Sequence, residues 1–225
     1  MKRAAAFILI PLALAAAYLH PALAAETAVN APVPARHANE AAGLKTAIFA
    51  GGCFWGVEAV FSHVKGVTSA VSGYHGGAGT AATYDQVSQG DTRHAEAVRV
   101  IYDPAVVRYD DLLRVFFSVI ADPTQLDRQG PDVGSQYRTA LVPMNEEQRQ
   151  VAAAYLAQMA GSGVWRRPIV ARIEPFHRFF PAEPYHQDFA MRNPGHPYIT
   201  FWDAPKVAAL RRLFPAIYKG DFTPP

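Results

Sequence analysis

Residues 50–58 read AGGCFWGVE and contain the only cysteine of the 225-residue chain, Cys53, between small residues and two large aromatic ones. The preceding segment, residues 46–50, is short and apolar and predicts a strand. Downstream, apolar side chains recur at the spacing of one helix face, at Phe54, Val57, Phe61 and Val64. The sequence therefore predicts that Cys53 lies where a strand gives way to a helix.

A cysteine at a helix N-terminus has a favourable place for reaction. Unpaired backbone N–H groups and the positive end of the helix dipole favour a thiolate over a thiol. Gly51 and Gly52 allow a tight turn and leave the sulfur open to approach. A buried, inert cysteine is the alternative. Because the adjacent Phe54 and Trp55 cannot share one helix face, we favour an activated sulfur nucleophile beside an aromatic wall.

A second chemical group is predicted on the strand at residues 94–102. Side chains alternate across a strand, so Glu96 shares a face with Val98, Val100 and Tyr102. That face is the bulkier apolar one, and a carboxyl buried there keeps its proton towards neutral pH. Such a group can act as a general acid. The alternative is an exposed glutamate at the end of the strand.

Other motifs exclude some functions or indicate where function lies. The Gly-rich loop at residues 73–79 has no Walker lysine, which argues against a phosphate cradle. The pair His94 and Glu96 is typical of zinc deaminases, but their Cys-x-x-Cys partner cannot exist in a chain with one cysteine. The long polar segment 125–138 is of the kind that carries function.

The first 24 residues have the pattern of a secretory signal peptide. Lys2 and Arg3 precede an apolar run, and Ala22-Leu23-Ala24 is a small-x-small cleavage pattern. We therefore expect cleavage after Ala24 and export to the periplasm. An uncleaved membrane anchor is the alternative, but the run is short and contains Pro11. In an oxidising compartment a lone, unpaired cysteine indicates a thiol that is needed.

Composition sets the class of protein and its partners. Half of the residues are hydrophobic and 18% are charged, so the chain is not intrinsically disordered. It has 21 basic and 19 acidic residues, and Lys2 and Arg3 belong to the predicted signal, so the mature chain carries no net formal charge. The mature sequence has no basic patch of the kind that would indicate a nucleic acid or an anionic lipid surface as partner.

The predicted organisation is one domain with short appendages. Residues 25–44 lack periodicity and predict a flexible linker, residues 45–219 a single catalytic domain, and residues 220–225 a tail. Further strands are predicted at residues 67–72, 94–102, 139–142 and 169–173. Further helices are predicted from 110 or 111 to 120, from 145 to 160, and from 203 to 214. This order predicts an α+β two-layer sandwich with a mixed sheet and an irregular C-terminal segment.

Five more stretches accompany the cysteine motif in order along the chain: Thr83-Tyr84, residues 94–98, Asp122-Pro123-Thr124, residues 129–138 and residues 182–187. Together they resemble the peptide methionine sulfoxide reductase A family over roughly residues 46–193. The resemblance implies a ferredoxin-like core. It also implies an enzyme that reduces methionine S-sulfoxide, free or in proteins, to methionine, and so repairs proteins after oxidation.

The resemblance implies catalytic roles for five residues. Cys53 would be the nucleophile that attacks the sulfoxide sulfur, and Glu96 the acid that protonates the sulfoxide oxygen. Tyr84 and Tyr137 would donate hydroxyl hydrogen bonds to that oxygen, and Asp132 would support the polar network beside them. A protonated oxygen is a better leaving group, so the residue types suit the chemistry.

The resemblance also implies a substrate pocket. Phe54 and Trp55 would form the walls that hold the methyl group on sulfur, and His186 would line the same pocket. Phe189 stands where a tyrosine often follows in the family, so this flank lacks that hydroxyl.

Many relatives have further cysteines near the C-terminus, whereas none follows Cys53 here. The cysteine sulfenic acid that forms must then be reduced by an external thiol, from a thioredoxin-like or glutaredoxin-like protein or, in vitro, dithiothreitol. We expect no bound cofactor, no metal, no nucleic acid, no stable membrane span and a monomer.

Two other functions stay open from the residues alone. A Cys-His hydrolase or acyltransferase would use His75, His94 or His186 as its base and would form an acyl-enzyme. A non-catalytic module would bind methionine-rich or oxidised peptides in the aromatic pocket without turnover.

Overall fold

Strand β1 (Lys45–Gly51) and helix α1 (Phe54–Ser62) form on either side of Cys53, as predicted. The structure is a computed structural model, and residues 27–223 of it are described. The predicted signal peptide and its cleavage site lie outside these residues. No helix within 27–223 is long and apolar enough to cross a membrane.

The centre of the sheet is antiparallel. It comprises β1, β2 (Val67–His75), β3 (Ala95–Tyr102) and β6 (Thr139–Val142), in the spatial order β6-β1-β3-β2. Helix α1 connects β1 to β2, and α3 (Tyr109–Val115) lies between β3 and β6 in the chain. This is the strand order and connectivity of a ferredoxin-like core, which confirms the predicted fold class.

Two short strands widen this core to six strands. β7 (Arg172–Ile173) pairs in parallel with β6, and β8 (Phe179–Pro181) pairs antiparallel with β2. The sheet is therefore mixed, as predicted. The strand predicted at residues 169–173 is confined to its last two residues.

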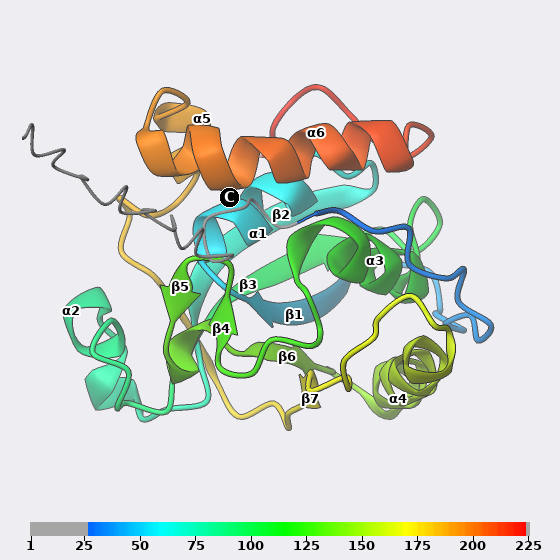
Figure 1. Ribbon diagram of the computed structural model, residues 1–225, viewed down its shortest axis with the longest axis horizontal. Helices are drawn as coiled ribbons and strands as arrows, with labels where there is room; N and C mark the ends of the chain where they lie inside the picture. The colour runs from blue at the N-terminus through cyan, green and yellow to red at the C-terminus, as the bar shows by residue number, and fades with distance from the viewer. Residues whose placement is uncertain (1–26, 224–225) are drawn as a thin grey trace, which may run out of the picture.

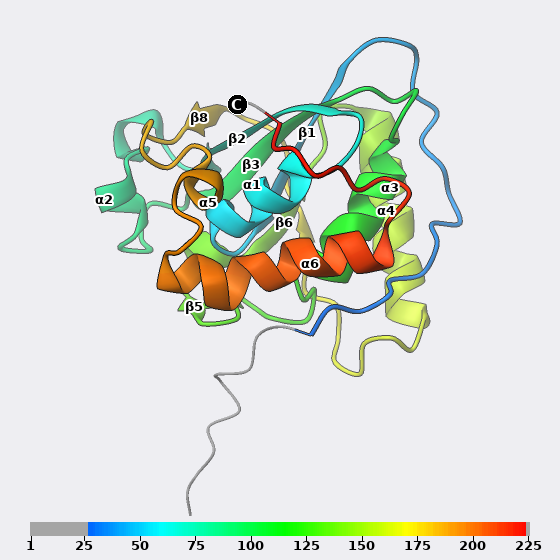
Figure 2. The same ribbon diagram turned by 90° about the horizontal axis from the view of Figure 1, so that it is seen from above.

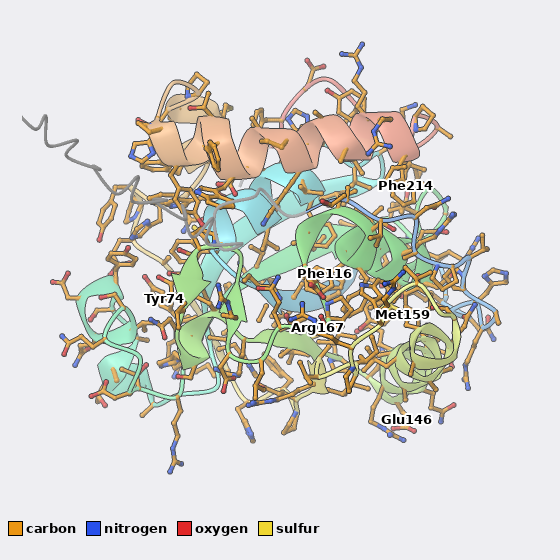
Figure 3. All side chains as sticks on the ribbon, viewed as in Figure 1. Tyr74, Phe116, Glu146, Met159, Arg167 and Phe214 are labelled. Carbon is orange, nitrogen blue, oxygen red and sulfur yellow. The ribbon has the colours of Figure 1, made fainter. Side chains whose placement is uncertain are left out.

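The main core lies between the sheet and the helices on one of its faces (Figure 1). Helix α1 packs on the sheet, and α6 (Ala204–Leu213) lies on the outer side of α1 (Figure 2). Helix α3 continues as a π-helix over Phe116–Ile120. The buried Phe116 ring lies under it (Figure 3), 5.3 Å from the Phe49 ring and 6.5 Å from that of Phe61.

Helix α4 (Glu146–Gly161) lies beside α3 and begins as the sequence predicts. The Asn145 side chain accepts a hydrogen bond from the backbone N–H of Gln148 at 2.9 Å, which caps the helix. The remaining elements are short: α2 (Tyr84–Val87), β4 (Arg128–Gln129), β5 (Asp132–Val133), α5 (Phe189–Arg192), 3₁₀ turns at Gly79–Ala81 and Ser135–Tyr137, and a π-helix at Ile199–Asp203.

The N-terminal segment differs from the flexible linker expected over residues 25–44. Its described part packs across α3 and α4, where Tyr155 donates to the Pro32 carbonyl at 2.8 Å. His37 Nδ1 lies 2.8 Å from the buried carboxylate of Asp110. Glu40 accepts the Tyr109 backbone N–H at 3.0 Å. No pattern in the sequence predicted this packing, because the contacts are made by isolated side chains without periodicity.

The expected tail also packs in part. Thr223 is buried, and its backbone N–H donates to the Ser62 carbonyl at the end of α1 at 3.0 Å. The C-terminal residues up to 223 thus close over α1 rather than extend from the domain.

Candidate active site

Cys53 is the N-cap residue of α1 and is partly exposed. The turn that presents it depends on Gly52, whose φ of +88° lies in the left-handed region. A Cβ added to Gly52 would come within 2.6 Å of the Gln129 side chain. The prediction of a glycine-dependent turn between strand and helix is therefore confirmed.

Glu96 lies next to the cysteine turn. Its carboxylate oxygen Oε2 accepts the backbone N–H of Phe54, the residue after Cys53, at 2.9 Å. The side chain is buried on the core face of β3 together with Val98, Val100 and Tyr102. Burial raises the pKa of Glu96 to about 8, against the opposing effect of the Phe54 hydrogen bond. The predicted neutral carboxyl is therefore present at neutral pH.

The sulfur itself differs from the expected thiolate. Burial, followed by the charges of Glu96, Asp203 and Asp132, raises the pKa of the Cys53 thiol, and only the Trp55 backbone N–H acts in the opposite direction. The first N–H of α1, from Phe54, is directed at Glu96 rather than at sulfur. The resting protein therefore holds Cys53 as a thiol, and the expected activation by the helix terminus is wrong for this state.

Tyr84 and Tyr137 converge on the same place from different elements. Tyr84 begins α2, and Tyr137 ends the 3₁₀ turn at Ser135–Tyr137. Burial raises the pKa of both phenols, that of Tyr84 to about 12, and the nearby charges of Glu96 and Cys53 raise them further. Both hydroxyl groups therefore keep their protons and can donate hydrogen bonds.

Phe54, Trp55 and His186, the residues predicted to form the aromatic wall, lie together in the structure. Phe54 is buried, and the ring centroids of Phe54 and His186 are 5.0 Å apart. The Trp55 indole N–H donates to His186 Nδ1 at 3.1 Å. Because this nitrogen accepts, His186 is the tautomer with its proton on Nε2, and burial lowers its pKa. The Tyr84 ring lies 4.4 Å from the His186 ring, so the wall joins the hydroxyl donors.

The structure adds Tyr198, which the sequence did not indicate. Its hydroxyl donates to Asp132 Oδ2, and its ring packs edge-on against Trp55 with centroids 5.9 Å apart. Asp132 thus connects the polar and aromatic parts of the site. Tyr198 lies in an irregular stretch after Gly195 and Pro197, where no periodicity marks a buried side chain.

Asp203 is a second residue that sequence reasoning missed. It precedes α6 and resembles a helix cap in sequence, but its side chain caps no N–H of α6. Its carboxylate lies against Gly56 in the first turn of α1, where an added Cβ would be 2.2 Å from Oδ1. Cys53 is therefore surrounded by the carboxyl groups of Glu96, Asp132 and Asp203.

Of the three histidines considered as bases, His186 lies in the aromatic wall with its Nδ1 accepting from Trp55, whereas His94 and His75 lie in other surroundings. His94 Nδ1 accepts the Gly77 backbone N–H at 3.2 Å, and its Nε2 lies 2.9 Å from the Ala78 carbonyl oxygen. His75 is buried, stacks on Phe176 and lies 3.9 Å from Glu174. The groups that act on the sulfur are carboxyls, so the geometry does not support a Cys-His hydrolase. Among residues 27–223, no three His, Cys, Asp or Glu side chains gather as a metal site.

Several known proteins are similar to this chain in sequence and fold. The family model described as peptide methionine sulfoxide reductase matches residues 45–216. The chain belongs to the peptide methionine sulfoxide reductase family. The Mesorhizobium japonicum protein named peptide methionine sulfoxide reductase MsrA 2 is 54% identical over 178 residues, which cover 79% of this chain and 91% of that one. A Synechocystis protein of the same name is 49% identical over 174 residues, covering 77% and 81% of the two chains.

Two solved structures are similar to this one. Methionine sulfoxide reductase A of Corynebacterium diphtheriae is 31% identical, with a TM-score of 0.57 over 78% of this chain and 85% of that chain. Reduced Mxr1 from Saccharomyces cerevisiae is 32% identical, with a TM-score of 0.61 over 68% and 87%. The predicted family, its reaction on methionine S-sulfoxide and the α+β fold are thereby confirmed.

The thiol state of Cys53 can be tested by alkylation. We expect the rate of reaction with iodoacetamide to keep rising up to about pH 9, because the reactive thiolate forms only above the ordinary cysteine pKa of about 8.5. Glu96 becomes negatively charged only as the pH passes about 8, so Glu96→Gln should increase the rate above that pH and have little effect below it. The same protein unfolded in urea is the control. A plateau in the rate near neutral pH would show instead that the resting sulfur is already ionised.

Proposed function

We propose that Cys53 and Glu96 carry out the reduction of methionine S-sulfoxide, with Tyr84, Tyr137 and Asp132 arranging the donors around the oxygen. The observation that carries this assignment is the hydrogen bond between Glu96 and the amide next to Cys53, which holds a neutral carboxyl beside the sulfur. A general acid must lie within reach of the atom it protonates, and this arrangement meets that need.

The first step transfers one oxygen atom. The Cys53 sulfur attacks the sulfoxide sulfur while Glu96 gives its proton to the oxygen, and the thiol proton replaces it on Glu96. The sulfoxide and the thiol become methionine and a cysteine sulfenic acid, so atoms and electrons balance. Tyr84 and Tyr137 stabilise the oxygen as its charge grows, because phenol donors fixed in a partly dry site need no reorganisation.

The aromatic wall holds the substrate methyl group between Phe54 and Trp55, with His186 behind Trp55. An apolar pocket discriminates by only about 1–3 kcal/mol per methylene. The orientation of the sulfoxide therefore depends on the hydrogen bonds to its oxygen.

The second step requires an external reductant. Cys53 is the only cysteine, so the sulfenic acid reacts with a thiol from outside to form a mixed disulfide and water. A second such thiol then releases Cys53 and a disulfide. A thioredoxin-like or glutaredoxin-like protein suits this role. The partly exposed position of Cys53 supports direct attack on the sulfur.

The place of action is proposed from the first 24 residues, whose charge and cleavage pattern are typical of a secretory signal peptide. Export to the periplasm would give a mature protein whose N-terminal sequence begins at Ala25. An N-terminal sequence that begins at Met1 would contradict it.

The activity is tested with the mature protein, an S-epimer methionine sulfoxide peptide and dithiothreitol. We expect methionine to form, and a single turnover without dithiothreitol to leave a sulfenic acid on Cys53 that dimedone labels. Cys53→Ser should show neither product. If the wild type formed no methionine, the proposed chemistry would be wrong; an acyl-enzyme would indicate the hydrolase instead.

The role of Glu96 predicts both a rate and a pH profile. Glu96→Gln should slow the first step by about two to four powers of ten, the usual contribution of a general acid. In the wild type, kcat should fall as the pH rises through about 8, because the protonated form of Glu96 is then lost. Single-turnover rates measured by rapid quench check both effects. A normal rate in Glu96→Gln would rule out its assignment as the acid.

A further inference from the structure

The pocket wall at Trp55 is held by a segment distant in sequence. Besides the hydrogen bond from the indole N–H to His186, the Trp55 ring stacks on Phe189 with centroids 3.8 Å apart and planes 9° apart. Both partners belong to residues 186–189. The position of this segment therefore decides the position of the wall.

Two side chains fasten the segment to the rest of the fold. Gln187 bonds to both the N–H and the carbonyl of Ser72 in β2, each at 3.0 Å. Glu58 Oε2 accepts the backbone N–H of Asp188 at 3.0 Å. Glu58 lies one helical turn after Trp55 in α1, so this bond ties the segment to the helix that carries Cys53.

The bond is made in a buried and acidic setting. Glu58 is 2% exposed and Asp188 8%. Glu58 Oε1 and Asp188 Oδ1 have no hydrogen-bond partner in the described part of the chain. Burial and the Asp188 carboxyl raise the pKa of Glu58 to about 8, while the Asp188 N–H and Ser72 act in the other direction. Asp188 itself has a φ of 52°, a left-handed conformation that non-glycine residues rarely adopt.

The other charged groups near α1 influence groups other than the Glu58 carboxyl. Arg192 of α5 lowers the pKa of Asp188, opposing the effect of burial. Glu96 from β3 and Asp203 from the π-helix before α6 act on Cys53, at the N-terminal end of α1. His63 caps the other end of α1, beside Lys219 and Asp221.

We infer that Glu58 is a positioning residue for the substrate pocket, which in its neutral form holds the segment 186–189 against Trp55 and releases it when ionised. The inference deepens the proposed reduction, because it assigns the fit of the sulfoxide methyl group to a group that touches no substrate. An ionised Glu58 would face the Asp188 carboxylate in a buried site with one oxygen unpaired, which is unfavourable.

The sign of the pH effect follows from the two states of the segment. When it is docked, the pKa of Glu58 is about 8; when it is undocked, the carboxyl is hydrated and its pKa is near the ordinary value of about 4.3. Docking is therefore linked to proton binding and weakens as the pH rises between these values, and above about 8 it changes no further. This differs from Glu96, whose loss of the acid form reduces kcat above about 8.

The test measures KM and kcat separately with an uncharged methionine sulfoxide peptide, from about pH 6.5 to about pH 9. In the wild type, KM should rise by roughly three- to tenfold up to about pH 8 and then level off, within the linkage limit of tenfold per pH unit. Glu58→Gln keeps an acceptor oxygen but cannot ionise, so its KM should stay constant while kcat keeps the pH dependence due to Glu96. Glu58→Ala should raise KM at every pH by about tenfold, the equivalent of about 1.4 kcal/mol for a lost hydrogen bond.

The control variant is Glu146→Gln, at the exposed start of α4 and far from α1 (Figure 3), which should behave as the wild type. A merely structural role would lower the melting temperature of Glu58→Gln without altering the pH dependence of KM. If KM rises with pH in Glu58→Gln as steeply as in the wild type, the inference is overturned.

A second readout does not depend on activity. The NMR resonance of the Trp55 indole N–H reports its bond to His186, and we expect it to shift between about pH 6.5 and about pH 8. The shift should persist in Glu96→Gln and disappear in the double variant E58Q/E96Q. Loss of the shift in Glu96→Gln alone would overturn the inference, even if the protein reduced no sulfoxide at all.

Discussion

The hydrogen bond from the Phe54 amide to the Glu96 carboxyl is the contact on which the site depends. It joins the first turn of α1 to β3, and so brings together two segments 42 residues apart. The glycine turn at Gly52 sets where α1 starts, and the register of β1 against β3 sets the position of Glu96 along the sheet relative to that turn. Because both elements belong to the core, the distance between sulfur and acid is fixed by the fold itself.

This contact also explains why the resting sulfur is protonated. A helix N-terminus stabilises an anion only where its N–H groups are directed at that anion. Here the first N–H is directed at Glu96, and the carboxyl groups of Asp132 and Asp203 add negative potential around Cys53. In the resting site both the Cys53 sulfur and the Glu96 carboxyl are therefore protonated, and the reaction needs a proton on the sulfoxide oxygen. A thiol is also less readily oxidised than a thiolate, which protects the only cysteine between turnovers.

The sequence predicted those features that depend on local patterns of residues. The strand-to-helix turn, the buried face of β3 with Glu96 and the helix at Glu146–Gly161 follow from apolar spacing and capping residues, and the structure agrees. The family resemblance brought Tyr84, Tyr137 and His186 into one prediction; the two tyrosines lie near Cys53 and Glu96, and the His186 ring packs against that of Tyr84. Patterns of this kind are local, so they can be found in one chain.

What the sequence did not predict depends on contacts between distant segments. Asp203 looks like a helix cap and instead faces Gly56, and Tyr198 lies in a stretch without periodicity. The segment before Leu44 looked like a linker because its anchors, such as Glu40 and His37, are single polar side chains. The ionisation of Cys53 could not be predicted either, since it is set by how many carboxyls the fold gathers around it and not by its place in one helix.

The most direct measurement of this arrangement is the ionisation of Glu96 itself. With ¹³C-labelled glutamate, the Glu96 carboxyl resonance can be followed by NMR as the pH is raised, and Glu96→Gln identifies the signal. We expect a midpoint near 8, since the carboxyl is buried beside the Cys53 turn. A midpoint near the ordinary glutamate value of about 4.3 would mean that Glu96 is ionised at neutral pH and cannot be the acid.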